Sequence, residues 1–318
     1  MKRIIILLAA SFSFLDFNAQ ELSIPAQAQY LQDNPFSISP TFAGIGDNVR
    51  IRVNGMAQWI GIKDAPLNQS LFGDFRIADR DGVGVQLYND RNGYTRQYGA
   101  KFSYAHHLIL DEDTEQYLSL GISFNLNQFK IETENFDPIP DPSVTDNRFT
   151  QNYNFDIGFL YRIEDFFLAF NTSNILDKNL DNFNKIEPSQ LRNFQVYVGN
   201  RFRKRNENFE FEPSLFYQYF QSDKRSTTDA NIKFKLHDYE DYYWAGVTAR
   251  FLNDQSLKPL TVGPMVGFRK KNFYFGYSYQ ITTNKLVGYN SGTHTITLGL
   301  DFLQNLSNCP CTHDRIVY

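Results

Sequence analysis

The feature that most constrains this chain is a hydrophobic pattern with a period of two, repeated in one segment after another. From Thr295 to Phe302, Ile, Leu, Leu and Phe occupy every second position, with Thr, Gly and Asp between them. Such alternation indicates β-strands with one apolar and one polar face. It recurs in about fourteen segments. The predicted strands are 48–60, 68–78, 82–89, 93–109, 116–129, 150–162, 165–172, 192–204, 207–219, 229–237, 242–251, 260–269, 271–282 and 292–303.

The connections between these segments alternate in length. Those at one end are short, with turn residues such as Asp81-Gly82, and those at the other end are mostly long, as at 130–149 and 173–191. An even number of strands with this asymmetry is typical of bacterial outer-membrane barrels. A tilted strand of about ten residues also spans a bilayer. We therefore expect an all-β fold, a transmembrane antiparallel up-and-down β-barrel of about fourteen strands over residues 48–303.

Two soluble architectures would also alternate. In a sandwich or propeller the polar face meets bulk water and the loops need no asymmetry, and a lipocalin-like barrel has about eight strands. The polar face here carries charges of both signs, which cost little in a wide, wet lumen and several kcal/mol each in a dry core. Aromatic residues are 16 % of the chain, mostly Phe and Tyr. Aromatic girdles at the two membrane interfaces account for that excess.

The first nineteen residues read as a secretory signal peptide rather than as part of the fold. Lys2 and Arg3 precede an apolar run from Ile4 to Leu15, and we expect cleavage after Ala19. No later apolar run is long enough for a membrane-spanning helix, which needs about 20 residues. The formal net charge of −4 lacks the basic surplus of a nucleic-acid binder.

Residues 20–47 lack alternation and form an irregular N-terminal segment at the periplasmic mouth or in the lumen, while 304–318 form a short periplasmic tail. A disordered N-terminal tail is the alternative. Against it, the segment carries more apolar groups than a freely solvated tail would. These groups are Tyr30, Leu31, Phe36, Ile38 and Phe42. With both termini on the short-turn side, the long loops are expected outside the cell.

Few residues suggest chemistry. Cys309 and Cys311 could form a disulfide or, with His313, hold a metal ion. A structural zinc site needs four ligands, and these residues offer three. An oxidising periplasm also favours disulfide formation, so we expect the disulfide. His106 and His107 sit on one strand, so their rings point to opposite faces. No catalytic, cofactor-binding or metal-binding set can be placed. We expect a protein that is not an enzyme and has no cofactor, metal or small-molecule substrate.

Residues 27–66 resemble the opening of the PorP/SprF family of type IX secretion proteins. The matching positions are Gln29, Tyr30, Asn34, Pro35, Pro40, Ala43, Gly44, Gln58, Trp59 and Gly61. The departures from the family pattern are Ser39, Thr41, Phe42 and Met56. Residues 273–302 resemble the family's closing strands, with Gln280, Thr293 and Thr295 as departures.

The resemblance implies an outer-membrane barrel without enzymatic activity in a Bacteroidota-type cell. One branch of the family links the outer membrane to a periplasmic secretion lipoprotein, and the other serves a large secreted adhesin, often in gliding motility. The residues do not separate these branches. A general diffusion porin is the alternative function, and single-channel conductance distinguishes the two. The expected partner-binding residues are Tyr30, Asn34, Pro35, Phe36, Pro40, Phe42, Gly44, Arg50, Arg52, Glu210 and Glu212.

Overall fold

The computed structural model describes residues 28–46, 48–132, 148–176, 192–203, 207–221, 224–239, 241–254, 258–303 and 309–312. The predicted signal peptide lies outside them. The strands are β1 (Asn48–Ala57), β2 (Leu67–Ala78), β3 (Asp81–Asn92), β4 (Thr95–Asp111), β5 (Gln116–Ile131), β6 (Arg148–Ile163), β7 (Phe166–Ser173), β8 (Asn193–Asn200), β9 (Phe202–Arg203), β10 (Phe209–Phe220), β11 (Ser226–Asp238), β12 (Asp241–Leu252), β13 (Pro259–Lys270), β14 (Phe273–Thr282) and β15 (Thr293–Leu303).

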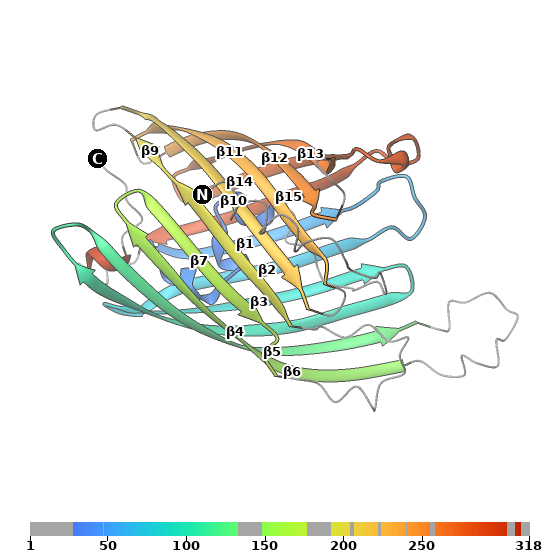
Figure 1. The fold of residues 1–318 in the computed structure, drawn as a ribbon, viewed down its shortest axis with the longest axis horizontal. Helices are drawn as coiled ribbons and strands as arrows, with labels where there is room; N and C mark the ends of the chain where they lie inside the picture. The colour runs from blue at the N-terminus through green and yellow to red at the C-terminus, as the bar shows by residue number, and fades with distance from the viewer. Residues whose placement is uncertain are drawn as a thin grey trace, which may run out of the picture.

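These strands form one closed antiparallel barrel (Figure 1). Each strand pairs with its neighbours in the sequence, and β1 closes the ring by pairing with both β2 and β15. The short β9 continues β8, because both pair with β10 and only Arg201 separates them. The wall therefore has 14 strands, and the predicted fold class is confirmed.

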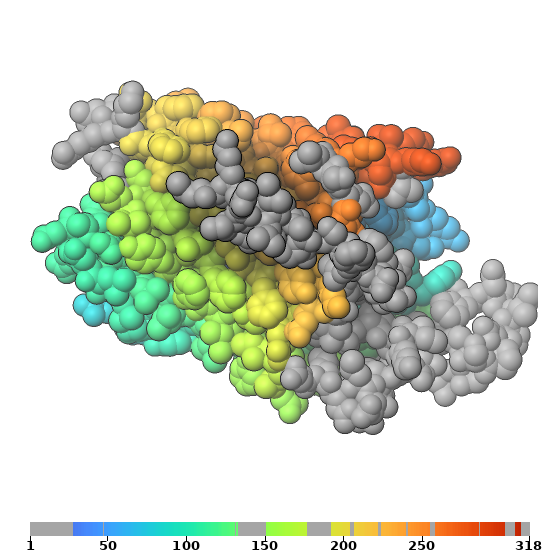
Figure 2. Space-filling view, viewed as in Figure 1, coloured from blue at the N-terminus to red at the C-terminus, as the bar shows by residue number. Residues whose placement is uncertain are grey.

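Alternation places apolar side chains outside the barrel and polar ones inside. On β15, the outward Leu298 is 45 % exposed, whereas Thr297 beside it is fully buried. On β5, Ile122 and Ser123 divide in the same way. Figure 2 shows side chains from the green, yellow and orange parts of the chain on the face of the wall turned toward the viewer. An apolar exterior around a polar interior is the arrangement that a lipid environment requires.

The connections differ between the two ends of the barrel. At one end they are tight turns, such as 271–272 between β13 and β14, and the two ends of the wall, Asn48 and Leu303, lie there as well. At the other end they are mostly longer, as at 283–292 between β14 and β15. We call these the turn end and the loop end. The two longest predicted loops, 130–149 and 173–191, lie largely outside the described residues, which omit 133–147 and 177–191.

Strand length varies around the ring, so the rim at the loop end is uneven. β4, β5 and β6 have 17, 16 and 16 residues, whereas β7 and β8 have 8 each. In Figure 1, β5 and β6 reach further toward the right than β7 does. Across the described residues, no helix is both long and apolar enough to cross a membrane.

Candidate functional site: the plugged lumen

The lumen holds the chain's own N-terminal segment, Ala28–Gly46, which we call the plug. It contains three short 3-10 helices, η1 (Gln29–Leu31), η2 (Pro35–Ser37) and η3 (Pro40–Phe42). Pro at the first position of η2 and η3 presets the backbone angle φ for a helical turn. All of its residues except Asp33, Pro35 and Ser37 are buried, so the wall encloses the plug almost completely.

The plug runs along the barrel from the loop side to the turn end. Gln29 donates from Nε2 to Asn68 Oδ1 (3.3 Å), and Asn68 is the second residue of β2 on its loop side. Arg76, near the turn end of β2, donates from Nε and Nη2 to the carbonyl of Gly46 (3.2 and 2.9 Å). The plug therefore crosses much of the lumen's length before the chain enters β1.

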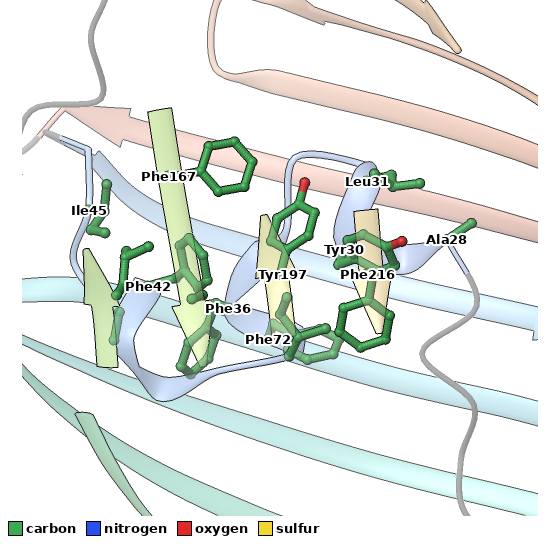
Figure 3. Close-up of a cluster of buried hydrophobic side chains, with 14 of the residues drawn as sticks. Ala28, Tyr30, Leu31, Phe36, Phe42, Ile45, Phe72, Phe167, Tyr197 and Phe216 are labelled. Atoms are coloured by element: carbon green, nitrogen blue, oxygen red, sulfur yellow. The ribbon is translucent and has the colours of Figure 1, made fainter. Parts of the chain in front are cut away.

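Tyr30 anchors the loop side of the plug. Its ring packs against Tyr197 and Phe216, with centroids 5.2 and 4.9 Å away (Figure 3). Its hydroxyl donates to Asp229 Oδ2 (3.3 Å) and accepts from Asn231 Nδ2 (2.9 Å). Burial raises the pKa of Tyr30 well above its usual value, so the group stays neutral. Burying such a side chain stabilises the plug by about 1.5–3 kcal/mol.

Asp33 is the only charged residue of the plug, and it meets a basic part of the wall. Its Oδ1 lies 2.5 Å from Nζ of Lys233 and 3.5 Å from Nζ of Lys235. Tyr242 donates its hydroxyl to Oδ2 (2.7 Å). Lys233 also donates to the carbonyl of Leu31 (3.2 Å). Burial alone would raise the pKa of Asp33, but the two lysines lower it well below its usual range. The carboxylate is therefore ionised and ties the plug to β11 and β12.

Glycines in the wall make room for the plug. The glycines that face it are Gly82, Gly84, Gly121, Gly158 and Gly276. A side chain at Gly82 would overlap the backbone of Ala43, and one at Gly84 would overlap the ring of Phe36. Since no larger residue fits beneath the plug at these positions, the wall is shaped for this occupant.

Near the turn end, polar groups of the wall bind the plug backbone. Gly44 donates its N–H to Asp74 Oδ2 (3.0 Å). Arg50 donates from Nη2 to the same Oδ2 (2.7 Å) and to the carbonyl of Phe42 (3.2 Å). Gly44 has φ 75°, a left-handed conformation that glycine adopts without strain. The chain can therefore turn here, from the plug toward β1.

His107 adds a further hold on the plug. Its Nε2 donates to the carbonyl of Ala43 (3.0 Å), and Nδ1 lies 2.7 Å from the Ser119 hydroxyl. His106 lies on the other face of β4, with Nδ1 2.7 Å from Asp81. The expectation that the two rings point to opposite faces is therefore confirmed.

The C-terminal residues close over the turn end. In η7 (Pro310–Thr312), the carbonyl of Thr312 accepts from the Gly46 N–H (2.7 Å), and that of Cys311 accepts from Arg162. A disulfide joins Cys309 to Cys311. His313 lies outside the described residues. Among the residues that are described, no three His, Cys, Asp or Glu side chains gather where they could hold a metal ion.

The predicted partner-binding residues fall into two groups. Those in the plug are Tyr30, Asn34, Pro35, Phe36, Pro40, Phe42 and Gly44, and Arg50 joins them through the Phe42 carbonyl. The other three have partners of their own in the wall. Arg52 forms a two-bond pair with Asp301 (2.5 and 3.1 Å). Glu210 and Glu212 pair with His237 (3.1 Å) and Arg201 (3.0 Å). The eleven residues therefore do not form one exposed surface.

Sequence reasoning missed Asp33 and the wall glycines, which contribute most directly to the plug's position. One signal was available for Asp33, since it is the only charge among nineteen residues otherwise rich in apolar groups. A lone charge in such a segment needs an opposite charge when it is buried. Nothing in the local pattern distinguishes Gly82 or Gly84 from glycines that face open space.

Comparison with known proteins gives one family. The family described as "Type IX secretion system membrane protein PorP/SprF" matches residues 19–300. No curated protein matches the chain.

Among solved structures, the CymD monoaromatic hydrocarbon channel is similar at 11 % identity and a TM-score of 0.50, covering 87 % of this chain and 92 % of the channel. Omp33 of Acinetobacter baumannii gives 10 % identity, a TM-score of 0.43 and coverage of 81 and 99 %. BamA of Haemophilus ducreyi gives 10 % identity, a TM-score of 0.39 and coverage of 80 and 70 %. At these identities, the likeness to the channel concerns the fold alone.

Proposed function

Because the chain belongs to the PorP/SprF family and is a type IX secretion component of the outer membrane, we propose that it holds a partner protein of that machinery. The partner is a secreted cell-surface adhesin or a periplasmic secretion lipoprotein, as the two branches of the family imply. The barrel itself is non-enzymatic, and its contribution to secretion or gliding is to bind and retain that partner at the outer membrane.

The observation that carries this proposal is the burial of the plug. A diffusion porin needs an open, water-filled lumen. Here Tyr30, Phe36 and Phe42 are 2, 3 and 7 % exposed inside the barrel. Glycines of the wall lie against the same segment, and Lys233 of the wall pairs with its Asp33 carboxylate. A lumen that contains a fitted segment of its own chain favours a protein-holding role over the porin alternative.

The burial also changes how the plug would serve a partner. Because Tyr30 and Phe36 are enclosed by the wall, a partner cannot touch them while the plug is in place. We therefore assign Tyr30 and Phe36 the role of holding the plug in place. The partner would instead bind at the mouth of the barrel that the plug supports. Gly44, Arg50 and the C-terminal residues around Thr312 meet at that mouth. Under the proposed topology, this mouth is periplasmic and the long loops are extracellular.

Deletion of residues 22–44 tests the proposal with two measurements. The shortened protein is expected to reach the outer membrane as a heat-modifiable barrel, to conduct ions as an open pore, and to lose export or surface display of the partner. The matched control is Gly55→Ala, because a methyl group there meets open space. Intact partner export in the deletion strain, or open-pore conductance by the unaltered protein, would overturn the proposal.

A further inference from the structure

The outer face of the barrel carries an unusual basic group at the loop end. Arg91, Arg96 and Lys130 lie directly opposite one another on β3, β4 and β5. They share their face with the exposed apolar residues Leu87 and Phe102, so they point out of the barrel rather than into the lumen. We call these three residues the basic row.

The basic row lies just beyond the apolar surface. Two positions nearer the turn end, the facing residues are Asn89, Tyr98 and Gln128. Another two positions toward the turn end, the outward residues are Leu87, Ala100 and Leu126. From there to the turn end, the outer face of these strands stays largely apolar. Toward the loop end, the outward side chains therefore change from apolar to amide and phenol groups, and then to cations. This order places the basic row at the depth of lipid headgroups.

Directly opposed like charges on neighbouring strands repel each other. Carboxylates nearby offset only part of this repulsion. Asp64 accepts from Arg91 Nη2 (3.3 Å) in a half-exposed ion pair, and Glu132 follows the end of β5. Lys63, beside Asp64, adds another positive charge. Among the described groups named here, the four cations Lys63, Arg91, Arg96 and Lys130 outnumber the two carboxylates Asp64 and Glu132, and an anion lying across the row would stabilise them.

Neighbouring amides hold Arg96 in position. Its Nε donates to Asn89 Oδ1 (2.8 Å), and Asn89 donates from Nδ2 to Gln69 Oε1 (3.1 Å). Within the described part of the chain, Asn89 is the only group that binds the Arg96 guanidinium. None of the described groups occupies its two terminal nitrogens, Nη1 and Nη2. A held guanidinium fork with a second arginine opposite matches the geometry of a phosphate group.

We infer that the basic row is a binding site for the phosphorylated headgroup of a lipid in the leaflet at the loop end. The ligand is a lipid rather than free phosphate, because the row borders an exposed apolar surface on which acyl chains can lie. Anionic headgroups attract basic clusters at a membrane surface in this way. Such a site would fix the depth and rotation of the β3–β5 wall in the membrane, independently of any protein partner.

The experiment uses the full-length protein in detergent, with diphosphorylated lipid A and its dephosphorylated form as probes. Binding is measured by native mass spectrometry. The unaltered protein is expected to bind the phosphorylated lipid at least about tenfold more tightly, and Arg91→Gln with Arg96→Gln to remove that preference. Lys270→Gln with Lys271→Gln, a basic pair at the turn end, is the matched control and should keep it.

Heat modifiability shows that each variant is folded. Equal binding of both lipids by the unaltered protein, or an unchanged preference in the double arginine variant, would overturn the inference. Inorganic phosphate separates the two sources of the anion. Millimolar phosphate should leave lipid binding largely intact, and full displacement at that concentration would show a free-phosphate site instead.

Discussion

Asp33 and Lys233 are 200 residues apart in the chain, yet inside the barrel the carboxylate lies 2.5 Å from the ammonium group. This pair joins the plug to β11, on the side of the ring away from the strand that follows the plug. A buried ion pair adds little net stability, because desolvation opposes the attraction, but leaving one charge unpaired costs about 3–5 kcal/mol. The pair therefore fixes where the plug lies more than how tightly the barrel holds together.

Breaking this pair should open the lumen. Asp33→Asn leaves Lys233 and Lys235 without their carboxylate, and Lys233→Met leaves Asp33 with one lysine fewer. Each single change is expected to destabilise the docked plug by about 3–5 kcal/mol and to produce conducting pores in planar bilayers. The double variant, Asp33→Asn with Lys233→Met, should form conducting pores less often than Lys233→Met alone. The reason is that both partners of the close pair are then neutral, so no charge is left unpaired between them. Closed pores in both single variants would show that the ion pair does not hold the plug.

The same pair predicts a response to acid. The folded-state pKa of Asp33 is lowered, so its contribution to plug docking is complete above the usual carboxyl value of 3.8 and is lost as the pH falls below it. Conductance of the unaltered protein should therefore rise below about pH 4. Asp33→Asn should already conduct at neutral pH and show a smaller change on acidification. An identical pH profile for the two proteins would assign the response to other carboxylates.

A side chain at a wall glycine should displace the plug without breaking the barrel. In Gly82→Val the Cβ atom alone would overlap the Ala43 carbonyl group, and such overpacking costs about 1–3 kcal/mol or more. Gly55→Val, on β1 where no atom is near, is the matched control. Protease cleavage within the plug measures the result. Cleavage should accelerate in Gly82→Val alone, and equal rates in both variants would contradict the assigned recess.

The two faces of β15 should respond differently to the same substitution. Leu298→Arg puts a charge on the lipid face and should destabilise the folded barrel by about 2–4 kcal/mol. Thr297→Arg, one residue away, meets the plug instead, because the Thr297 hydroxyl donates to Gln32 Oε1 in the lumen. It should release the plug and open the pore while the barrel still folds in lipid. Equal loss of folding in both variants would show that the faces are assigned wrongly.

The sequence by itself determined the wall. Alternation with a period of two specifies a strand and, at the same time, which residues face lipid, because successive side chains point to opposite sides. The pattern alone therefore assigns Thr297 and Leu298 to opposite faces, and the antiparallel ring follows from even strand count and loop asymmetry. The apolar content of residues 20–47 likewise indicates a segment that needs burial.

Only the tertiary structure decided what the plug touches. Closing the ring brings β3, β5 and β11 around one segment, so Gly82 meets Ala43 and Lys233 meets Asp33 through contacts that no local pattern encodes. The parity rule says that Lys233 faces the lumen, but not which of the lumen's charges lies opposite. That choice depends on how nineteen residues fold within an enclosed space, where steric fit and charge pairing act over the whole ring at once.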